Sequence, residues 1–273
     1  YESAMSIPIA LTIAGSDSSG GAGIQADIKT VIALGGYSAT AITALTAQNS
    51  LGVSAIEAVS PAFIASQMQA VLSDIGADII KTGMLGDGDA INAVVDVLDQ
   101  DAADTPLIVD PVMVAKGGAS LLGEDAKSVL KENLLPRAFL VTPNLPEAEA
   151  LLGCDITGID AMEDAARAIL ALGPNAVLLK GGHLPGDEIV DVLVNSDGVT
   201  RFDGKRINTP HTHGTGCTLA SAIATSLAQG MGLVPAVSRA RSYVLKAIAT
   251  APGLGSGHGP LNHGHGITPF QAD

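Results

Sequence analysis

Short apolar runs of strand length alternate with longer amphipathic segments of helix length along the whole chain. This alternation predicts an α/β fold, in which a mostly parallel sheet carries helices on both faces. Strands are expected over residues 9–14, 38–43, 78–82, 107–110, 139–142 and 176–180. Helices are expected over residues 23–34, 61–74, 87–99, 124–134, 146–152, 162–172, 216–229 and 234–251. Two further runs, 189–195 and 199–207, flank Ser196-Asp197-Gly198 and predict a β-hairpin.

No linker, low-complexity tract or internal repeat interrupts the 273 residues, so we expect one domain over residues 1–273. Met5 reads as a natural start, which would make residues 1–4 an addition ahead of it. Two long spans without full charges, 31–56 and 207–238, are broken by Gly, Gln, Asn, His or Pro. They therefore predict a buried core rather than a membrane span. The N-terminus shows no basic segment and no cleavage site of a secretory leader.

The composition excludes some classes of function. A net charge of −14, from 28 acidic against 14 basic residues, disfavours binding to nucleic acid. Cys154 and Cys217 are the only cysteines, which fits a reducing cytoplasm and excludes a disulfide framework. Because only 15% of the residues are charged and 47% are hydrophobic, we expect a partner subunit to cover part of the surface.

Residues with chemical potential directly follow the expected strands. They are Gly15-Ser16-Asp17, Gly83-Met84, Asp110-Pro111, Pro143-Asn144 and Gly181-Gly182-His183. In parallel sheets, functional residues gather beyond the carboxyl ends of the strands. The sequence therefore predicts one site along that edge.

The run Thr212-His213-Gly214-Thr215-Gly216-Cys217 precedes an Ala-rich helical segment. Two glycines let the backbone approach an anion, and a helix starting there would direct unpaired N–H groups toward a phosphate. Cys217 would lie in the first helical turn, where a thiol ionises most easily. The alternative is a glycine-rich turn before a buried helix, with an inert core cysteine.

The glycine-rich segment 14–23 lacks the spacing of a Rossmann fingerprint, and the chain contains no Walker A loop. The segment would instead let a small ligand lie close to the backbone, with Asp27 and Gln48 offering hydrogen bonds. The alternative for these two residues is a solvated helix face and a loop amide.

Asn144 and Glu147 are placed as the N-cap and capping-box partner of a helix. An amide and a carboxylate at this edge would also hold water on a hydrated Mg²⁺. Lys180 ends an expected strand just before two glycines, where a phosphate would explain its position. The same argument for a phosphate is weaker for Lys116, which precedes Gly117-Gly118, and its default interpretation is a lysine in a surface loop. The histidines lack the spacing of a zinc site.

Taken together, the chain closely resembles the hydroxymethylpyrimidine and phosphomethylpyrimidine kinases of thiamine biosynthesis, within the ribokinase-like family. The resemblance is carried, in family order, by the blocks ALTIAGSDSSGGAGIQADIKT, AITALTAQNS, KTGMLGD, VDPVMVAKGG, TPNLPEAEALLG, LLKGGHL, HTHGTGCTLASAIA and GHGPLNH. It implies a three-layer α/β/α sandwich with a central sheet of eight or nine strands, in a homodimer.

The resemblance also implies roles for individual residues. The pyrimidine pocket would be lined by Gly15, Asp27, Gln48, Met84 and Val112. Mg-ATP would be bound by Asp110, Asn144, Glu147, Lys180 and Thr215, with Asn144 and Glu147 holding Mg²⁺ through water. The transferred phosphoryl group would lie at Gly214, Gly216, Cys217 and Lys180, with Cys217 as the candidate base.

Two positions depart from patterns seen among the relatives. Many ribokinase-like relatives have an aspartate where this chain has Cys217, and Ser18 stands where proline is frequent. The leading hypothesis is a kinase that phosphorylates 4-amino-5-hydroxymethyl-2-methylpyrimidine and then its monophosphate. The rivals are a pyridoxal kinase and a non-catalytic binder of a nucleotide or vitamin on the same fold.

Overall fold

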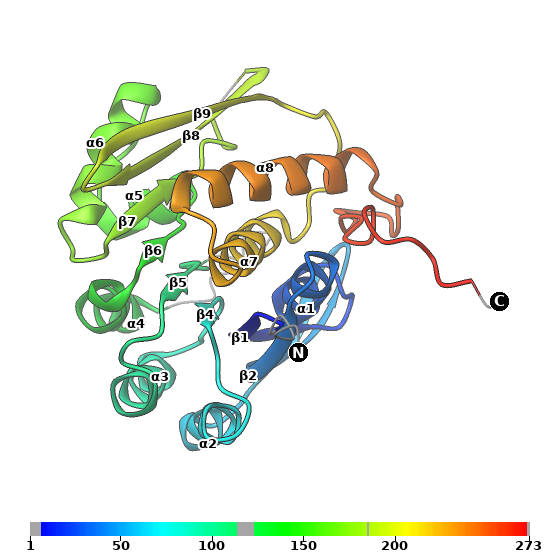
Figure 1. Ribbon diagram of the computed structural model, residues 1–273. Coiled ribbons are helices and arrows are strands. Elements are labelled where there is room, and N and C mark those ends of the chain that lie inside the picture. The colour runs from blue at the N-terminus through cyan, green and yellow to red at the C-terminus, as the bar shows by residue number, and fades with distance from the viewer. Residues whose placement is uncertain (1–6, 114–122, 185, 272–273) are drawn as a thin grey trace, which may run out of the picture.

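The computed structural model describes residues 7–113, 123–184 and 186–271. The expected addition at residues 1–4 and the loop residue Lys116 lie outside these ranges. The described residues form a nine-stranded sheet in the order β3-β2-β1-β4-β5-β6-β7-β8-β9 (Figure 1). The strands are β1 (Ile9–Asp17), β2 (Tyr37–Asn49), β3 (Gly52–Ala58), β4 (Ile79–Thr82), β5 (Leu107–Val109), β6 (Leu140–Val141), β7 (Ala176–Leu179), β8 (Glu188–Asn195) and β9 (Gly198–Lys205).

The central strands, from β2 to β7 in this order, run parallel. At one edge β3 pairs antiparallel with β2, and at the other β8 pairs antiparallel with both β7 and β9. This arrangement confirms the mostly parallel sheet. The predicted hairpin is the pair β8 and β9, joined at Asn195 and Gly198.

Helices cover both faces of the sheet (Figure 1). They are α1 (Gly23–Ala33), α2 (Pro61–Leu72), α3 (Gly88–Asp101), α4 (Glu124–Val129), α5 (Leu145–Leu152), α6 (Ile159–Leu170), α7 (Thr215–Ala228) and α8 (Leu233–Ala249). Alternate residues of the strands face two separate cores, as the two-residue period requires. Leu11 and Ile13 of β1 face the core shared with α2 to α6, whereas Ala10 faces the core shared with α1, α7 and α8. The fold is therefore the predicted three-layer sandwich.

Two elements differ from the sequence-based expectation. The strand expected over 38–43 continues to Asn49, and the chain returns as β3. The β3 strand is mostly exposed and therefore lacks the apolar run by which buried strands are found. The helix expected over 124–134 is α-helical only to Val129 and then forms a π-helical turn, Leu130–Leu134. Pro136, which has no N–H to donate, follows that turn.

Two glycines allow close backbone contacts, one between the end of β1 and the start of α1 and one between the loop after β1 and the start of α7. Gly23 has φ +54 and Gly214 has φ +82, both in the left-handed region that favours glycine. A Cβ at Gly23 would overlap the carbonyl oxygen of Gly15, and a Cβ at Gly214 would overlap that of Gly21. The close approach places both loops at the carboxyl edge of the sheet. None of the described helices combines the length and apolar character needed to cross a membrane.

Candidate active site

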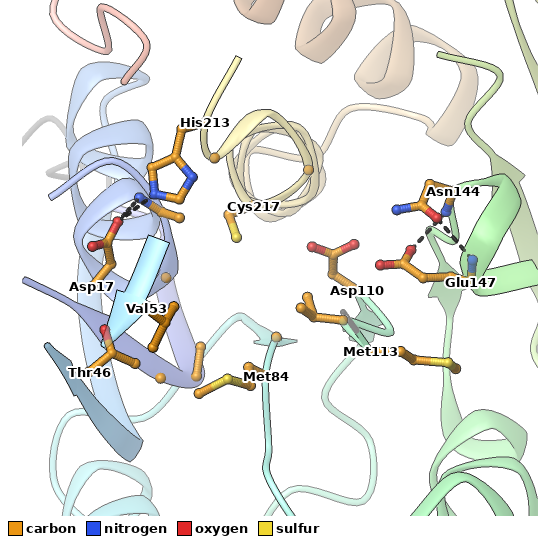
Figure 2. A pocket seen from close by; sticks show the side chains of 18 of the residues that line it. Asp17, Thr46, Val53, Met84, Asp110, Met113, Asn144, Glu147, His213 and Cys217 are labelled. Carbon is orange, nitrogen blue, oxygen red and sulfur yellow. Dashed lines mark hydrogen bonds and ion pairs between the residues drawn. The ribbon is translucent and has the colours of Figure 1, made fainter. Parts of the chain in front are cut away.

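A cavity of about 440 Å³ opens at the carboxyl edge of the sheet, between the loop after β1, the strand β2, the ends of β4 and β5, and the start of α7. Most of the predicted site residues line it, and Figure 2 shows several of them facing a common space. The predicted residues in the lining are Gly15, Gln48, Met84, Asp110, Val112, Asn144, Glu147, Lys180, Gly214, Gly216 and Cys217.

A second cavity, of about 200 Å³, adjoins the first. The two share Asn144, Lys180, His183 and Gly216 in their linings. Its own walls include Thr215 and three apolar side chains, namely Leu219, Val244 and Ile248. The arrangement thus provides two binding spaces that meet at one polar junction.

A positive charge is held at this junction. Lys180 follows β7, and its Nζ donates to Asp110 Oδ1 at 3.0 Å. Burial alone would lower the pKa of Lys180, but the carboxylates of Asp110 and Glu147 outweigh it and raise that pKa, so the lysine stays charged. A Cβ at Gly216 would lie 3.3 Å from Lys180 Nζ and 3.6 Å from Asp110 Oδ2. Glycine therefore keeps space open beside the charged groups.

The capping box predicted at the start of α5 is confirmed. Asn144 accepts from the Glu147 backbone N–H at 2.9 Å, and the Glu147 carboxylate accepts from the Asn144 N–H at 2.8 Å. Burial and the nearby carboxylate of Asp110 together raise the pKa of Glu147 to about 7, against the opposing effect of Lys180. The carboxylates of Asp110 and Glu147 point toward each other (Figure 2). Two carboxylates that face each other in this way fit a bound cation.

A cation at this place would keep much of its water. Among the residues that the structure describes, no three His, Cys, Asp or Glu side chains are grouped to hold a metal ion directly. Mg²⁺ is typically bound in this sparse way, through one or two carboxylates and several waters. The donor set of Asp110, Glu147 and Asn144 therefore fits a hydrated Mg²⁺.

Cys217 lies in the first turn of α7, partly exposed in the larger cavity (Figure 2). Burial raises the pKa of its thiol to about 11, despite the opposing effect of Lys81. The expectation of an easily ionised thiol is therefore wrong, because desolvation disfavours the thiolate more than the nearby positive charge favours it.

The placement of Asp27 argues against its expected contact with the pyrimidine. Asp27 is fully buried and does not line either cavity. Its carboxylate accepts from Lys81 Nζ at 3.0 Å and from Ser221 Oγ at 2.7 Å. Lys81 is also fully buried. Together with Ser221, the pair joins α1, β4 and α7.

Three polar residues without a predicted role lie in the cavity wall: Asp17, Thr46 and His213 (Figure 2). His213 Nε2 lies 2.8 Å from Asp17 Oδ2. Burial would raise the pKa of Asp17, but the hydrogen bonds from His213, Ser19 and Ala22 lower it to about 2. Asp17 is the last residue of β1, and His213 directly precedes Gly214. Their position next to the recognised motifs is the sequence feature that could have identified them as site residues.

The sequence profile of the phosphomethylpyrimidine kinase family matches residues 17–262. The thiamine biosynthesis bifunctional protein ThiED of Geobacter sulfurreducens is 55% identical over 253 residues, which are 93% of this chain and about half, 51%, of that protein. The hydroxymethylpyrimidine/phosphomethylpyrimidine kinase of Bacillus subtilis is 46% identical over 260 residues, covering 95% of this chain and 96% of that protein.

Solved structures of the same fold include the ADP complex of Bacillus subtilis pyridoxal kinase. It has a TM-score of 0.87 and 35% identity, and the match covers 95% of this chain and 98% of that one. The fold is ribokinase-like. With a family match over most of its length and close relatives that bear the family's name, the chain belongs to the phosphomethylpyrimidine kinase family.

Proposed function

We propose that the protein transfers the γ-phosphoryl group of ATP to the hydroxyl of 4-amino-5-hydroxymethyl-2-methylpyrimidine, and then phosphorylates the monophosphate to the diphosphate. Both steps belong to thiamine biosynthesis. The observation that carries this proposal is the meeting of two cavities at Lys180 and Gly216, within a chain of this family. Two substrates bound in adjoining spaces can react directly, because the phosphoryl group has only to cross the junction.

The larger cavity is the proposed place of the pyrimidine. Met84 packs against the Gly15 backbone so closely that a Cβ at position 15 would overlap its methyl group. Together with Val112, these residues form an apolar wall suited to a flat ring. Gln48 supplies polar atoms to the same cavity.

The smaller cavity is the proposed place of the nucleotide base, against Leu219, Val244 and Ile248, with Thr215 beside it. Its phosphates would then extend toward Asn144 and Lys180. Asp110 and Glu147, with Asn144, would hold a hydrated Mg²⁺, which neutralises phosphate charge when bound.

Phosphoryl transfer depends mainly on positioning and electrostatic stabilisation, because its transition state is loose. We assign the stabilisation to Lys180 and to the backbone N–H groups from Gly214 to Cys217 at the start of α7. Cys217 is assigned to orient the substrate hydroxyl. Because burial raises the pKa of its thiol to about 11, the thiol is protonated at neutral pH. It would therefore orient the hydroxyl through a hydrogen bond, and the hydroxyl proton would pass to an oxygen of the transferred phosphoryl group as the bond to phosphorus forms.

A pyridoxal kinase is the second candidate, and it is favoured by the TM-score of 0.87 to the Bacillus subtilis pyridoxal kinase. The sequence identities favour the pyrimidine, since they are 55% and 46% to the two thiamine relatives and 35% to the pyridoxal kinase. A non-catalytic binder is disfavoured because Lys180, Glu147 and Cys217 all line the larger cavity.

We also propose a homodimer in the cytoplasm. The edge strand β3 exposes Ile56 (48%), and Leu51 in the preceding turn is 73% exposed. An exposed edge strand with apolar side chains is a template for pairing with a second chain. The two cysteines are unpaired, as a reducing compartment favours. Sedimentation velocity at micromolar concentration is expected to give the mass of two chains, and a monomer would reject the homodimer.

The test of the activity is a coupled ADP-release assay with Mg-ATP and the pyrimidine alcohol, followed by mass spectrometry of the product. We expect ADP release that depends on the alcohol, with products that carry one and then two phosphoryl groups. ADP release without a phosphorylated pyrimidine would reject the proposed function.

A further inference from the structure

Each end of the Gln48 side-chain amide faces a neighbouring atom whose hydrogen-bonding role does not match it. Its nitrogen Nε2 lies 3.3 Å from His213 Nε2, and its oxygen Oε1 lies 3.2 Å from Thr46 Oγ1. The two ends of an amide differ in chemistry, since the oxygen only accepts hydrogen bonds and the nitrogen only donates them. Which end faces which neighbour decides what Gln48 presents to the cavity.

The first contact is decided by Asp17. Its carboxylate accepts from the backbone N–H groups of Ser19, Gly21 and Ala22 and from the Ser19 hydroxyl. Surrounded by these donors, the carboxylate is ionised and acts only as an acceptor. The Nε2 atom of His213, 2.8 Å from Asp17 Oδ2, must therefore carry a proton. An N–H at this position favours an oxygen from Gln48, not an N–H₂ group.

The second contact is decided by Ser16. Thr46 Oγ1 lies 2.8 Å from the Ser16 carbonyl oxygen, which can only accept. A hydroxyl has one proton, so Thr46 donates it to Ser16 and can only accept from Gln48. This contact favours the N–H₂ group of Gln48. Both neighbours thus require the same half-turn of the amide, although the two arguments are independent.

We propose that Thr46 and the Asp17–His213 pair are specificity-determining positioning residues that hold the Gln48 amide with its oxygen toward His213 and its N–H₂ toward Thr46. The cavity then presents one N–H donor beside one carbonyl acceptor. This pair complements a ring nitrogen next to an exocyclic amine, the edge of a 4-aminopyrimidine. Pyridoxal has no such edge. The substrate part of the inference rests on the proposed function, whereas the amide orientation does not.

Neutron diffraction from deuterium-exchanged crystals of the wild-type protein tests the orientation directly. We expect deuterium on His213 Nε2 and on the Gln48 amide atom that faces Thr46. Deuterium on the amide atom that faces His213, or its absence from His213 Nε2, would overturn the proposal. No variant has to fold for this measurement.

Kinetics test the consequence for specificity. Two analogues of the pyrimidine alcohol are compared in the wild type: one has C–H in place of the ring nitrogen next to the amino group, and the other has hydrogen in place of the amino group. Each change is expected to lower kcat/KM by about tenfold to a hundredfold. Thr46→Val removes the acceptor for the N–H₂ group and is expected to reduce these penalties at least about threefold, whereas Thr46→Ser retains the hydroxyl and the penalties.

The ratios separate positioning from a structural role. If Thr46→Val lowers kcat/KM equally for the parent alcohol and both analogues, the residue only supports the fold and the specificity role is wrong. A melting temperature of each variant accompanies the kinetics. If the wild type does not turn over the parent alcohol, the proposed function fails, and the neutron result still decides the amide orientation.

Discussion

At the residue scale, Cys217 is the side chain whose role the structure changes most. Its raised pKa keeps the thiol protonated in the resting protein, but its place at the start of α7 leaves it next to the proposed phosphoryl position. Cys217→Ala is expected to lower kcat about 10²-fold, because the substrate hydroxyl then loses the contact that positions it for attack. The KM for ATP and the melting temperature should stay close to the wild-type values.

Cys154→Ala is the matched control, because Cys154 is exposed and does not line either cavity. Since the thiolate is the reactive form, an alkylating reagent at neutral pH is expected to modify Cys154 before Cys217. Near wild-type turnover by Cys217→Ala would assign the chemistry to the Gly214–Cys217 backbone and Lys180 alone.

Glu147 links the site to pH. Burial raises its pKa from 4.5 to about 7, so the folded state binds the carboxyl proton more tightly than the unfolded chain does. Ionisation therefore costs stability: the free energy of unfolding should fall as pH rises from about 4.5 to 7, by on the order of 3 kcal/mol in total. Glu147→Gln keeps an acceptor for the capping bond and should lose this pH dependence.

The measurement is urea unfolding of the wild type and Glu147→Gln at pH 5 and pH 8 without divalent cations. Relative to the wild type, the variant should gain stability at pH 8. Added Mg²⁺ should restore part of the wild-type loss and leave the variant unchanged. Parallel pH curves for both proteins would show that ionised Glu147 is not the source of the cost.

At the scale of elements, the alternation of apolar runs predicts the layers and most strand positions because each buried segment carries its own period. The capping box of α5 is equally local, since Asn144 and Glu147 interact within one helical turn. The strand β3 escapes such reasoning because its side chains are mostly exposed. Contacts between distant segments, such as His213 with Asp17 and Gln48, have no local signature at all.

Asp27 shows the same limit, since its partner Lys81 is 54 residues away in the chain. Asp27→Asn leaves a buried lysine without its counter-charge and is expected to cost about 3–5 kcal/mol of unfolding free energy. In the folded fraction, the KM for the pyrimidine should remain unchanged. Gln48→Ala, which removes a cavity side chain, is expected to raise the KM for the pyrimidine and to leave the free energy of unfolding unchanged. A raised KM with intact stability in Asp27→Asn would restore its role in substrate binding.

At the scale of the whole molecule, the sheet brings loops from five of its strands and the start of α7 to one edge, where two cavities meet. The fold alone does not choose between two flat heteroaromatic alcohols, because the specificity of the cavity for one ring depends on individual side chains rather than on the layers. The choice of substrate is therefore the part of the account most exposed to experiment.

Direct competition tests it. The pyrimidine alcohol and pyridoxal, at equal concentrations with limiting Mg-ATP, are incubated with the protein, and both phosphorylated products are quantified by mass spectrometry. The product ratio gives the ratio of kcat/KM without separate fits. We predict at least about tenfold more phosphorylated pyrimidine, as expected when one buried polar group loses its partner in the poorer substrate. Equal amounts, or an excess of phosphorylated pyridoxal, would contradict the account.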